Sequence, residues 1–252
     1  MNVTVSGEGK PVVLLHGVGL DQAMWERQVP ALADRHRVIT YDLLGHGRSA
    51  DAQDGASLDD WVRQLEGLLR ELKLERVSLV GFSFGGMIAQ GFAAKHLGMI
   101  DRLVLISTVY DRSESEQAGV LARLELARRE GPQAIVQAAI SRWFSSDFIA
   151  KNPNAIAEIT EVLKNNGAES FLSAYACFAK TRLGALEGFV RPTLIMTGEF
   201  DTGSTPAMAH KLAATIPGAR TSIVPQGRHM MPVELAIEVN SILFEFLGAA
   251  CG

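Results

Sequence analysis

A serine flanked by glycines lies between two apolar segments of the chain. The segment Gly81-Phe82-Ser83-Phe84-Gly85 follows the apolar run Val77–Val80 and precedes the apolar stretch Gly86–Ala94. The run has the β-branched residues of a buried strand, and the stretch has the length of a helix. A serine in a strained turn between them leaves no room for β-carbons two positions to either side. This context indicates a nucleophile whose hydroxyl stands above a helix N-terminus. A glycine-rich turn with an incidental serine has the same five-residue pattern and stays an alternative.

A serine hydroxyl is a weak nucleophile near neutral pH and needs a general base oriented by an acid. Asp201 follows the predicted strand Thr193–Met196, and His229 follows the predicted strand Thr221–Val224. Catalytic groups of open α/β sheets collect at the carboxyl ends of the strands. The order serine, acid, histidine is the one found in doubly wound hydrolases. We therefore predict that His229 takes the Ser83 proton and returns it to the leaving group, while Asp201 fixes the tautomer of His229.

Two other acids compete with Asp201. Glu199 lies in the same loop, and Asp111 follows the strand after the serine's helix. Asp201 is preferred because it directly precedes the small residues 202–206, which open a helix, although an aspartate in such a turn is often a local cap.

Among the histidines, His16 is the one serious rival to His229. It precedes the serine in the chain, so we expect it to support its own loop. His46 lies in a glycine-punctuated loop, where a structural hydrogen bond is expected. The others, at helix ends or within a helix, are predicted to be surface residues: His36, His96 and His210.

The loop His16-Gly17-Val18-Gly19 follows the predicted strand Val12–Leu15. A tetrahedral intermediate requires two N–H donors directed at its oxyanion. We predict the Phe84 backbone N–H as one donor, because it directly follows the nucleophile, and the Val18 N–H as the other. A plain glycine-rich turn is the alternative for this loop.

Composition limits the classes of protein and partner. The chain has 252 residues, 47% of them hydrophobic and 21% charged, which suits one globular α/β protein with a substantial core. The net charge of −4 gives no electrostatic reason to bind nucleic acid or an anionic membrane. No apolar run approaches the roughly 20 residues of a membrane helix. The N-terminus lacks the features of a signal peptide, and Cys177 and Cys251 cannot form a disulfide framework. We expect a cytoplasmic monomer or homodimer that acts on a small molecule without metal or cofactor.

Strands and helices alternate along most of the chain, which predicts a doubly wound, mostly parallel sheet. Ser57 and Asp60 have the spacing of a capping box before an amphipathic helix that extends to Leu72. Helices are also expected over residues 21–33, 206–214 and 233–247. The predicted strands are Asn2–Val5, Val12–Leu15, Arg37–Asp42, Val77–Val80, Leu103–Ile106, Thr193–Met196 and Thr221–Val224.

The alternation stops between residues 111 and 186, where only helical patterns occur. Breaks at Gly131-Pro132, Asn152-Pro153 and Asn166-Gly167 separate four predicted helices. These are expected at 113–130, 133–144, 154–165 and 168–181. We predict a helical cap over 111–186, inserted into a core formed by 1–110 and 187–252.

Five landmarks occur in order along the chain. They are His16-Gly17, Asp42-x-x-Gly45-x-Gly47-x-Ser49, Gly81-x-Ser83-x-Gly85-Gly86, Gly198-x-x-Asp201 and Gly227-x-His229. Because it has these five motifs in this order, the chain resembles the α/β-hydrolase superfamily over nearly its whole length. Three further segments look like those of 3-oxoadipate enol-lactonases: Arg128-Arg129-Glu130-Gly131 and Arg142-Trp143-Phe144-Ser145 in the cap, and Asp21-x-x-Met24-Trp25-x-x-Gln28. The resemblance implies an α/β-hydrolase fold with a helical cap and the triad Ser83, Asp201 and His229.

A serine at the elbow points to acyl transfer to water, because similar dehalogenases and epoxide hydrolases use aspartate there. We expect cleavage of a small carboxylic ester or (enol-)lactone. C–C or amide hydrolysis, perhydrolase chemistry with the same triad, and a ligand-binding receptor on a hydrolase scaffold stay alternatives. Fold alone does not decide among them.

The expected substrate pocket lies under the cap. Trp143 is expected in its roof, and Phe84 and Met230 are expected to shape it because they flank catalytic residues. Further aromatic candidates, which equally fit a packed core, are Phe144, Phe171, Tyr175 and Phe178. Three cap arginines are either solvated or paired with a substrate carboxylate: Arg128, Arg129 and Arg142.

Overall fold

The computed structural model describes residues 1–186 and 188–248. Cys251 and residue 187, the predicted start of the second core segment, lie outside these residues. The described chain contains a seven-stranded sheet in the order β1-β3-β2-β4-β5-β6-β7, with β1 antiparallel to β3 and every other pair parallel. The strands are β1 (Val3–Ser6), β2 (Lys10–Leu15), β3 (His36–Tyr41), β4 (Val77–Phe82), β5 (Ile100–Ile106), β6 (Thr193–Gly198) and β7 (Arg220–Val224). This is the predicted fold class.

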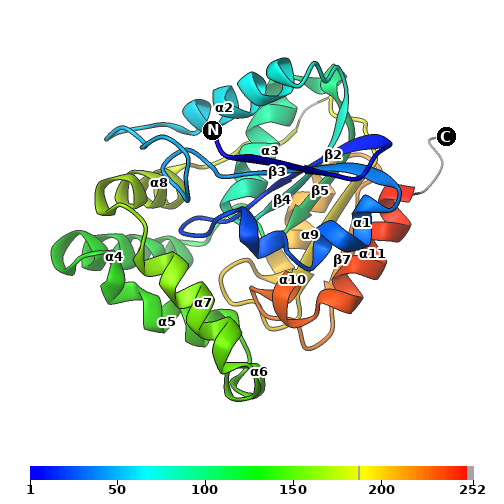
Figure 1. Ribbon diagram of the computed structural model, residues 1–252. Coiled ribbons are helices and arrows are strands. Elements are labelled where there is room, and N and C mark those ends of the chain that lie inside the picture. Colours follow the sequence, from blue (N-terminus) through cyan, green and yellow to red (C-terminus); the bar gives the residue numbers. More distant parts are fainter. Residues whose placement is uncertain (187, 249–252) are drawn as a thin grey trace.

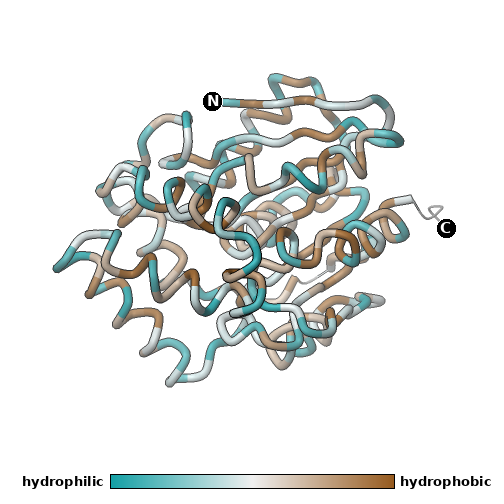
Figure 2. Tube along the Cα trace, turned by 60° about the horizontal axis from the view of Figure 1, so that its bottom comes forward, coloured by the Kyte–Doolittle hydropathy of each residue, from teal (hydrophilic) through white to brown (hydrophobic). Residues whose placement is uncertain are grey.

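The sheet is covered on both faces, since every residue of β4 and of β6 is buried. In β4, Leu79 packs into one hydrophobic cluster and Val80 into the other, as the two-residue period of a strand requires. The first cluster includes side chains of α2 (Leu58–Glu71), α3 (Phe84–Lys95) and α9 (Pro206–Ala214). The second includes side chains of α1 (Gln28–Ala33) and α11 (Ala236–Gly248). Figure 1 shows the sheet between these layers, and Figure 2 shows hydrophobic and hydrophilic residues alternating along the outer helices.

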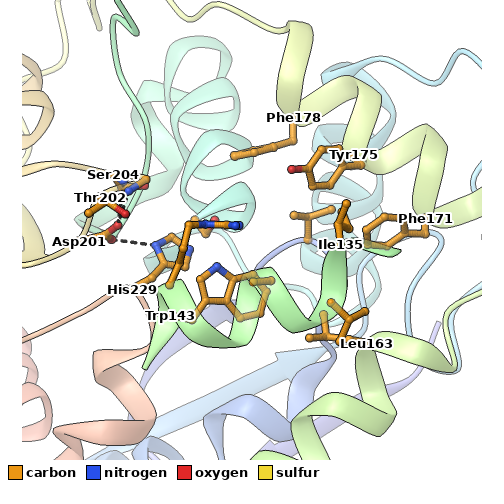
Figure 3. Close-up of a pocket in the computed structure, with 16 residues that line it drawn as sticks. Ile135, Trp143, Leu163, Phe171, Tyr175, Phe178, Asp201, Thr202, Ser204 and His229 are labelled. Carbon is orange, nitrogen blue, oxygen red and sulfur yellow. Dashed lines mark hydrogen bonds and ion pairs between the residues drawn. The ribbon is translucent and has the colours of Figure 1, made fainter. Parts of the chain in front are cut away.

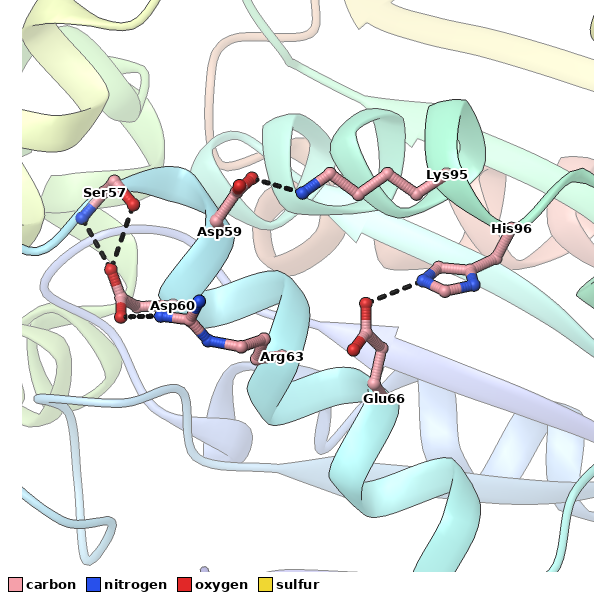
Figure 4. Close-up of polar contacts among 7 residues, drawn as sticks. All are labelled: Ser57, Asp59, Asp60, Arg63, Glu66, Lys95 and His96. Carbon is pink, nitrogen blue, oxygen red and sulfur yellow. Dashed lines mark hydrogen bonds and ion pairs between the residues drawn. The ribbon is translucent and has the colours of Figure 1, made fainter.

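Helix α2 begins as its sequence predicts. The Ser57 N–H donates to the Asp60 carboxylate at 2.8 Å, which forms half of a capping box. Its apolar stripe is buried against α3, and two polar contacts, an ion pair and a histidine–carboxylate hydrogen bond, join α2 to the end of α3 (Figure 4). Lys95 Nζ lies 2.7 Å from Asp59, and His96 Nε2 lies 2.6 Å from Glu66. Exposed pairs of this kind contribute little, so the buried stripe fixes α2 on the sheet.

In the described part of the chain, the segment between β5 and β6 contains helices and no strand, and it lies at one end of the sheet (Figure 1). It contains α4 (Glu114–Glu130), the 3-10 helix η3 (Pro132–Ile135), α5 (Val136–Trp143), α6 (Ser146–Lys151), α7 (Pro153–Lys164) and α8 (Ala168–Lys180). Helix α6 corresponds to none of the four helices predicted for this segment. It is only six residues long and begins where the Ser145 hydroxyl accepts the Phe148 N–H at 3.1 Å. The division into a core and a cap stays a prediction.

Two helices predicted as continuous are interrupted. The segment 21–33 forms the 3-10 helix η1 (Gln22–Trp25) and then α1, and the last predicted helix forms α10 (Met231–Glu234) and α11. The expectation that His36 is a surface residue is wrong. Strand β3 begins at His36, whose ring is buried with Nδ1 3.3 Å from the Leu32 carbonyl oxygen. In the described part of the chain, no helix has the length and hydrophobicity needed to cross a membrane. A cytoplasmic location stays a prediction.

The start of α3 approaches β2 so closely that only glycine fits at residue 85. A β-carbon there would lie 2.3 Å from the Leu15 carbonyl oxygen and 2.5 Å from that of His16. Both atoms belong to the backbone, so a side chain at residue 85 would push helix and strand apart. By contrast, a β-carbon on Gly67, within α2, would meet nothing within 4 Å.

These two helical glycines give a matched stability test. Gly85→Ala should destabilise the fold by more than ~2 kcal/mol through overpacking. Gly67→Ala should stabilise it by ~0.5–1 kcal/mol, because alanine loses less backbone entropy in a helix. Urea unfolding followed by circular dichroism measures both. Equal effects of the two substitutions would contradict the close approach of α3 to β2.

Candidate active site

Ser83 occupies the turn between β4 and α3 in a strained backbone conformation. Its φ of 52° lies in the left-handed region, with ψ at −112°. The Ser83 N–H donates to the Ile106 carbonyl oxygen at 2.8 Å. The Ser83 carbonyl oxygen accepts the Gly86 N–H at 3.0 Å and the Thr108 hydroxyl at 2.9 Å. These bonds hold the turn from the side of β5, so the strain at Ser83 is offset by its neighbours.

Glycines around the Ser83 turn allow it to pack closely against neighbouring residues. A β-carbon on Gly81 would lie 2.4 Å from the Gly85 carbonyl oxygen, which confirms the steric reason for glycine on both sides of the serine. A β-carbon on Gly86 would lie 2.6 Å from Cβ of Thr108. The missing side chain at residue 86 therefore lets Thr108 reach the Ser83 carbonyl.

Asp201 and His229 form a buried pair beyond the ends of β6 and β7. Asp201 Oδ2 accepts the His229 Nδ1–H at 2.8 Å, and Asp201 Oδ1 accepts the backbone N–H groups of Gly203 and Ser204 at 2.9 Å each. Burial alone would raise the pKa of Asp201, but attraction to His229 and the donated hydrogen bonds together lower it. An ionised Asp201 keeps the proton on Nδ1, which leaves Nε2 of His229 free to accept one.

The loops that carry these two residues meet through a pair of glycines. A β-carbon on Gly198 would lie 2.3 Å from the backbone of Gly227, and one on Gly227 would lie 2.9 Å from Cα of Gly198. Any side chain at either position would separate the loops. Asp201 and His229 are thus brought to hydrogen-bond distance by direct backbone contact.

Ser83, Asp201 and His229 line one cavity beneath the helices between β5 and β6 (Figure 3). Val18 and Trp143 lie in its wall, and the Trp143 ring is 5.7 Å from the His229 ring. The cavity has a volume of about 70 Å³, counted as the space that the centre of a water-sized sphere can occupy. A cavity of this size suits a small ligand. The structure therefore brings together five residues that the sequence assigns to one site.

The Val18 and Phe84 N–H groups have no hydrogen-bond acceptor in the described part of the protein. His16 fixes the peptide that carries the Val18 N–H. Because His16 Nε2 accepts the Leu43 N–H at 2.9 Å, its proton is on Nδ1, which donates to the Gly17 carbonyl oxygen at 2.8 Å. Holding the carbonyl end of the Gly17–Val18 peptide fixes the direction of the Val18 N–H at the other end.

A family model described as the alpha/beta hydrolase family matches residues 12–241, which is most of the chain. The chain belongs to the alpha/beta hydrolase family. With the hydrolase names of its relatives, this membership makes it a hydrolase enzyme.

The hydrolase is 28% identical to the (E)-2-((N-methylformamido)methylene)succinate hydrolase of Acinetobacter baylyi, over 96% of this chain and 91% of that one. It is 30% identical to 3-oxoadipate enol-lactonase 1 of the same organism, over 81% and 77% of the two chains. The enol-lactonase structure from Burkholderia xenovorans superposes with a TM-score of 0.91 at 29% identity, covering 98% of this chain and 96% of that one. The resemblance to enol-lactonases seen in the sequence is thereby confirmed.

The rival acids and histidines of the hydrolase lie elsewhere or have other partners. Asp111 is exposed and pairs with Lys211 at 2.8 Å, which lowers its pKa. Glu199 accepts the Gln226 N–H at 2.9 Å and so links the loops that carry Asp201 and His229. His46 Nδ1 lies 3.0 Å from the Leu44 carbonyl oxygen, as expected for a structural role. His210 is exposed, and His96 is partly exposed at the end of α3.

Phe84 and Met230 do not line the cavity, so their predicted place in its wall is wrong. The Phe84 side chain points into the core, where its ring lies 5.1 Å from the Trp61 ring and 6.4 Å from the Phe178 ring. Met230 is fully buried, and its N–H donates to the Trp143 carbonyl oxygen at 3.0 Å. Both residues instead contact residues that line the cavity: Phe84 packs on Phe178, and Met230 holds the Trp143 backbone.

Half of the residues that line the cavity come from one face of each of two helical segments. The sequence offers the aromatic residues among them as candidates but does not single out Ile135, Val136 and Ala139. Residues of η3 and α5 contribute with spacings of three and four, as do aromatic residues of α8. This spacing is the signal that identifies them in the sequence. The lining residues are Ile135, Val136, Ala139, Arg142 and Trp143 from the first face, and Phe171, Tyr175 and Phe178 from the second. Leu163 and the acid loop, Thr202, Gly203 and Ser204, complete the wall. Phe144 packs instead on Phe148, 5.2 Å between ring centroids.

Two neutral histidines lie buried beside the Val18 loop, with ring centroids 5.2 Å apart. Burial lowers the pKa of His16 from 6.5 to about 3, with repulsion from His46 as a second cause. Burial also lowers the pKa of His46 from 6.5 to about 4. The unfolded chain therefore binds protons below about pH 6.5 that the folded chain does not, and stability falls as the pH falls.

We expect the free energy of unfolding to decrease between about pH 6.5 and pH 4. Near pH 5 each buried histidine should account for ~2 kcal/mol of the loss. His46→Gln should remove about half of this pH dependence, and His210→Gln, on the exposed face of α9, should leave it unchanged. Urea unfolding at a series of pH values measures the slopes. Identical slopes for all three proteins would rule out buried neutral histidines as the cause.

Proposed function

We propose that the hydrolase cleaves a small carboxylic ester or lactone through an acyl-enzyme, with Ser83 as nucleophile, His229 as general base and acid, and Asp201 as the residue that orients His229. The observation that carries the proposal is the buried Asp201–His229 hydrogen bond of 2.8 Å, beside a cavity that Ser83 also lines. A base with a fixed tautomer next to a strained, glycine-flanked serine is the arrangement that activates a hydroxyl.

The proposed reaction has two steps. Ser83 Oγ attacks the substrate carbonyl carbon while its proton moves to His229 Nε2, and the oxyanion accepts the Val18 and Phe84 N–H groups. The carbonyl then re-forms, the bond to the leaving oxygen breaks, and that oxygen takes the proton from His229. A water molecule then attacks the carbonyl carbon of the acyl-enzyme while His229 takes its proton. His229 returns that proton to Ser83 Oγ as the acyl bond breaks, which releases the carboxylic acid and free Ser83. Asp201 stays ionised throughout, consistent with its lowered pKa.

The relatives support hydrolysis of this kind, because two of the proteins compared above are named enol-lactonases. Amide hydrolysis stays a second candidate on one observation, the N-methylformamido group in the name of the succinate hydrolase relative. The same triad serves both, since only the leaving atom differs.

Ser83→Ala should abolish turnover of p-nitrophenyl acetate, and a fluorophosphonate should label the wild-type protein at Ser83. The matched control is Ser107→Ala. Ser107 also follows a parallel strand with a left-handed φ, of 46°, and is buried, but it is no part of the proposed mechanism. Activity assays and mass spectrometry of the labelled peptide measure the result. Full activity of Ser83→Ala would contradict the proposed mechanism.

Asp201→Asn should lower kcat/KM by about 10³–10⁴-fold, because His229 would lose the partner that fixes its tautomer. Asp111→Asn serves as control and should stay within about threefold of wild type, since its partner is Lys211 on the surface. Steady-state kinetics on the same ester compare them. A large loss in Asp111→Asn with none in Asp201→Asn would reassign the acid.

A further inference from the structure

A second cavity lies behind one wall of the active-site cavity. Its volume is about 240 Å³, against about 70 Å³ for the active-site cavity counted in the same way. Residues of α3, of α4, of the chain after β5 and of the chain after α8 form its wall. Asp111 and Arg182 belong to this wall and are exposed, so the second cavity opens to the surface.

The two cavities lie next to each other along the same two helices. On α8, Phe178 lines the active-site cavity and Thr181, directly after the last turn, lines the second cavity. Three residues of a helix rise by only about 4.5 Å. On α3, Met87 lines the second cavity, and its N–H donates to the carbonyl oxygen of Ser83 at 3.2 Å. The second cavity therefore begins within one helical turn of the active-site cavity on both helices.

The Phe178 ring and the Arg112 guanidinium form the partition between the cavities. Phe178 lines the active-site cavity, and Arg112 lines the second cavity. The guanidinium carbon lies over the Phe178 ring, 4.6 Å from its centre. One ring thus has the active-site cavity on one side and a residue of the second cavity on the other. Without this ring, the two cavities would be continuous.

Arg112 holds the partition closed through the backbone and the ring of the same residue. Two of its N–H groups donate to the Phe178 carbonyl oxygen at 3.2 Å each, in the last turn of α8, where a positive charge is favourable. Burial lowers the pKa of Arg112 to about 10, so the side chain is still charged at neutral pH. A guanidinium over an aromatic face is attracted to it, most strongly where water is excluded. The Phe178 ring is therefore fixed in the partition.

The leaving group and the acyl chain of a substrate face different walls of the active-site cavity. In the proposed mechanism His229 gives its proton to the leaving oxygen, so the leaving group lies beside His229 and Trp143, whose rings are 5.7 Å apart. Phe178 packs instead on Phe84, the residue after Ser83, with ring centres 6.4 Å apart. Figure 3 shows Trp143 beside His229 and Phe178 apart from both, on α8. A chain on the acyl side of the carbonyl therefore extends towards Phe178.

We propose that Phe178, held by Arg112, limits the substrate to a short acyl group, and that the second cavity is the continuation of the acyl site that this ring closes. The substrate class is then an ester or lactone with few carbon atoms on the acyl side. Removal of the ring joins the cavities, and a longer chain passes along α8 towards the surface. This inference rests on the proposed hydrolase function and specifies the size of its substrate.

The test compares kcat/KM for p-nitrophenyl hexanoate with kcat/KM for p-nitrophenyl acetate within each protein. A substitution that only weakens the fold lowers both values and leaves their ratio unchanged. In wild type the ratio should be below about 0.1, because the longer chain overpacks the closed cavity. Phe178→Ala should raise the ratio at least about tenfold, since each methylene group that becomes buried contributes about fourfold.

Arg112→Gln should raise the same ratio by about two- to fivefold, because the ring stays but loses the cation that holds it. The matched control is Phe171→Ala. It removes an aromatic ring from the same face of α8 and the same cavity, two turns away from the partition, and should change the ratio by less than about threefold. An unchanged ratio in Phe178→Ala, or an equal rise in Phe171→Ala, would overturn the proposal.

A double variant tests whether the longer chain enters the second cavity. Leu183 lines this cavity from the chain after α8, so Leu183→Trp fills the space that Phe178→Ala opens. The double variant should return the hexanoate-to-acetate ratio to within about threefold of wild type. A double variant that keeps the whole gain of Phe178→Ala would reject the second cavity as the continuation of the acyl site.

Methyl ketones separate this inference from the proposed chemistry, because they have a carbonyl and an alkyl chain but no leaving group. Calorimetry should show that Phe178→Ala raises the affinity for methyl hexyl ketone relative to methyl ethyl ketone at least about tenfold. This result in a protein that hydrolyses neither nitrophenyl ester would reject the hydrolase proposal and support the partition. An unchanged ratio of ketone affinities would reject the partition, whether or not the esters are hydrolysed.

Discussion

Direct contact of backbone with backbone at the carboxyl edge of the sheet is the constraint on which the site depends. At Gly81 and Gly85 the first turn of α3 lies against β4 and β2, and at Gly198 and Gly227 the acid and base loops lie against each other. In each case a β-carbon would come within 3 Å of main-chain atoms. Packed backbone does not deform continuously, so these contacts define where Ser83, Asp201 and His229 can be.

The polar groups around this edge differ in how fully they are satisfied. Asp201 is buried with every oxygen accepting a hydrogen bond, and His16 uses both ring nitrogens to hold its own loop. Such groups add order without needing a ligand. The Val18 and Phe84 N–H groups and the Arg142 guanidinium have donors left over. Donors without an acceptor at a cavity mark the places where a ligand that enters it would contribute most.

The parts of this structure that the sequence predicts are those specified by local signals. Every strand was predicted within a few residues, because apolar β-branched runs bounded by glycine have few other interpretations. The relative order of Ser83, Asp201 and His229 at strand ends placed them at one edge, where the structure brings them together. Side-chain direction was harder to predict. Phe84 and Met230 adjoin the triad in the chain yet point into the core, since adjacency along a helix or turn does not determine the face a side chain occupies. The α6 helix, six residues long, is too short for a helical period to show, although its local cap at Ser145 is present in the sequence. The burial of His36 depends on packing of the first strand residue that no short window of sequence contains.

The residues proposed to carry out the chemistry and the residues that would select the substrate come from different kinds of structure. The former sit in loops fixed by backbone contacts, whereas most of the latter are side chains on the faces of α5 and α8, spaced as helices require. Helix α8 is held to the core loop after β3 by side chains, with Ser170 bonded to Asp51 at 3.0 Å and Ser173 bonded to the Gln53 carbonyl oxygen at 2.6 Å. Substitutions on these helix faces leave the glycine contacts at the sheet edge untouched. The shape and polarity of the cavity can therefore change with a few helical side chains while Ser83, His229 and Asp201 stay in place, so the helical side chains are more informative about the substrate than these three residues are.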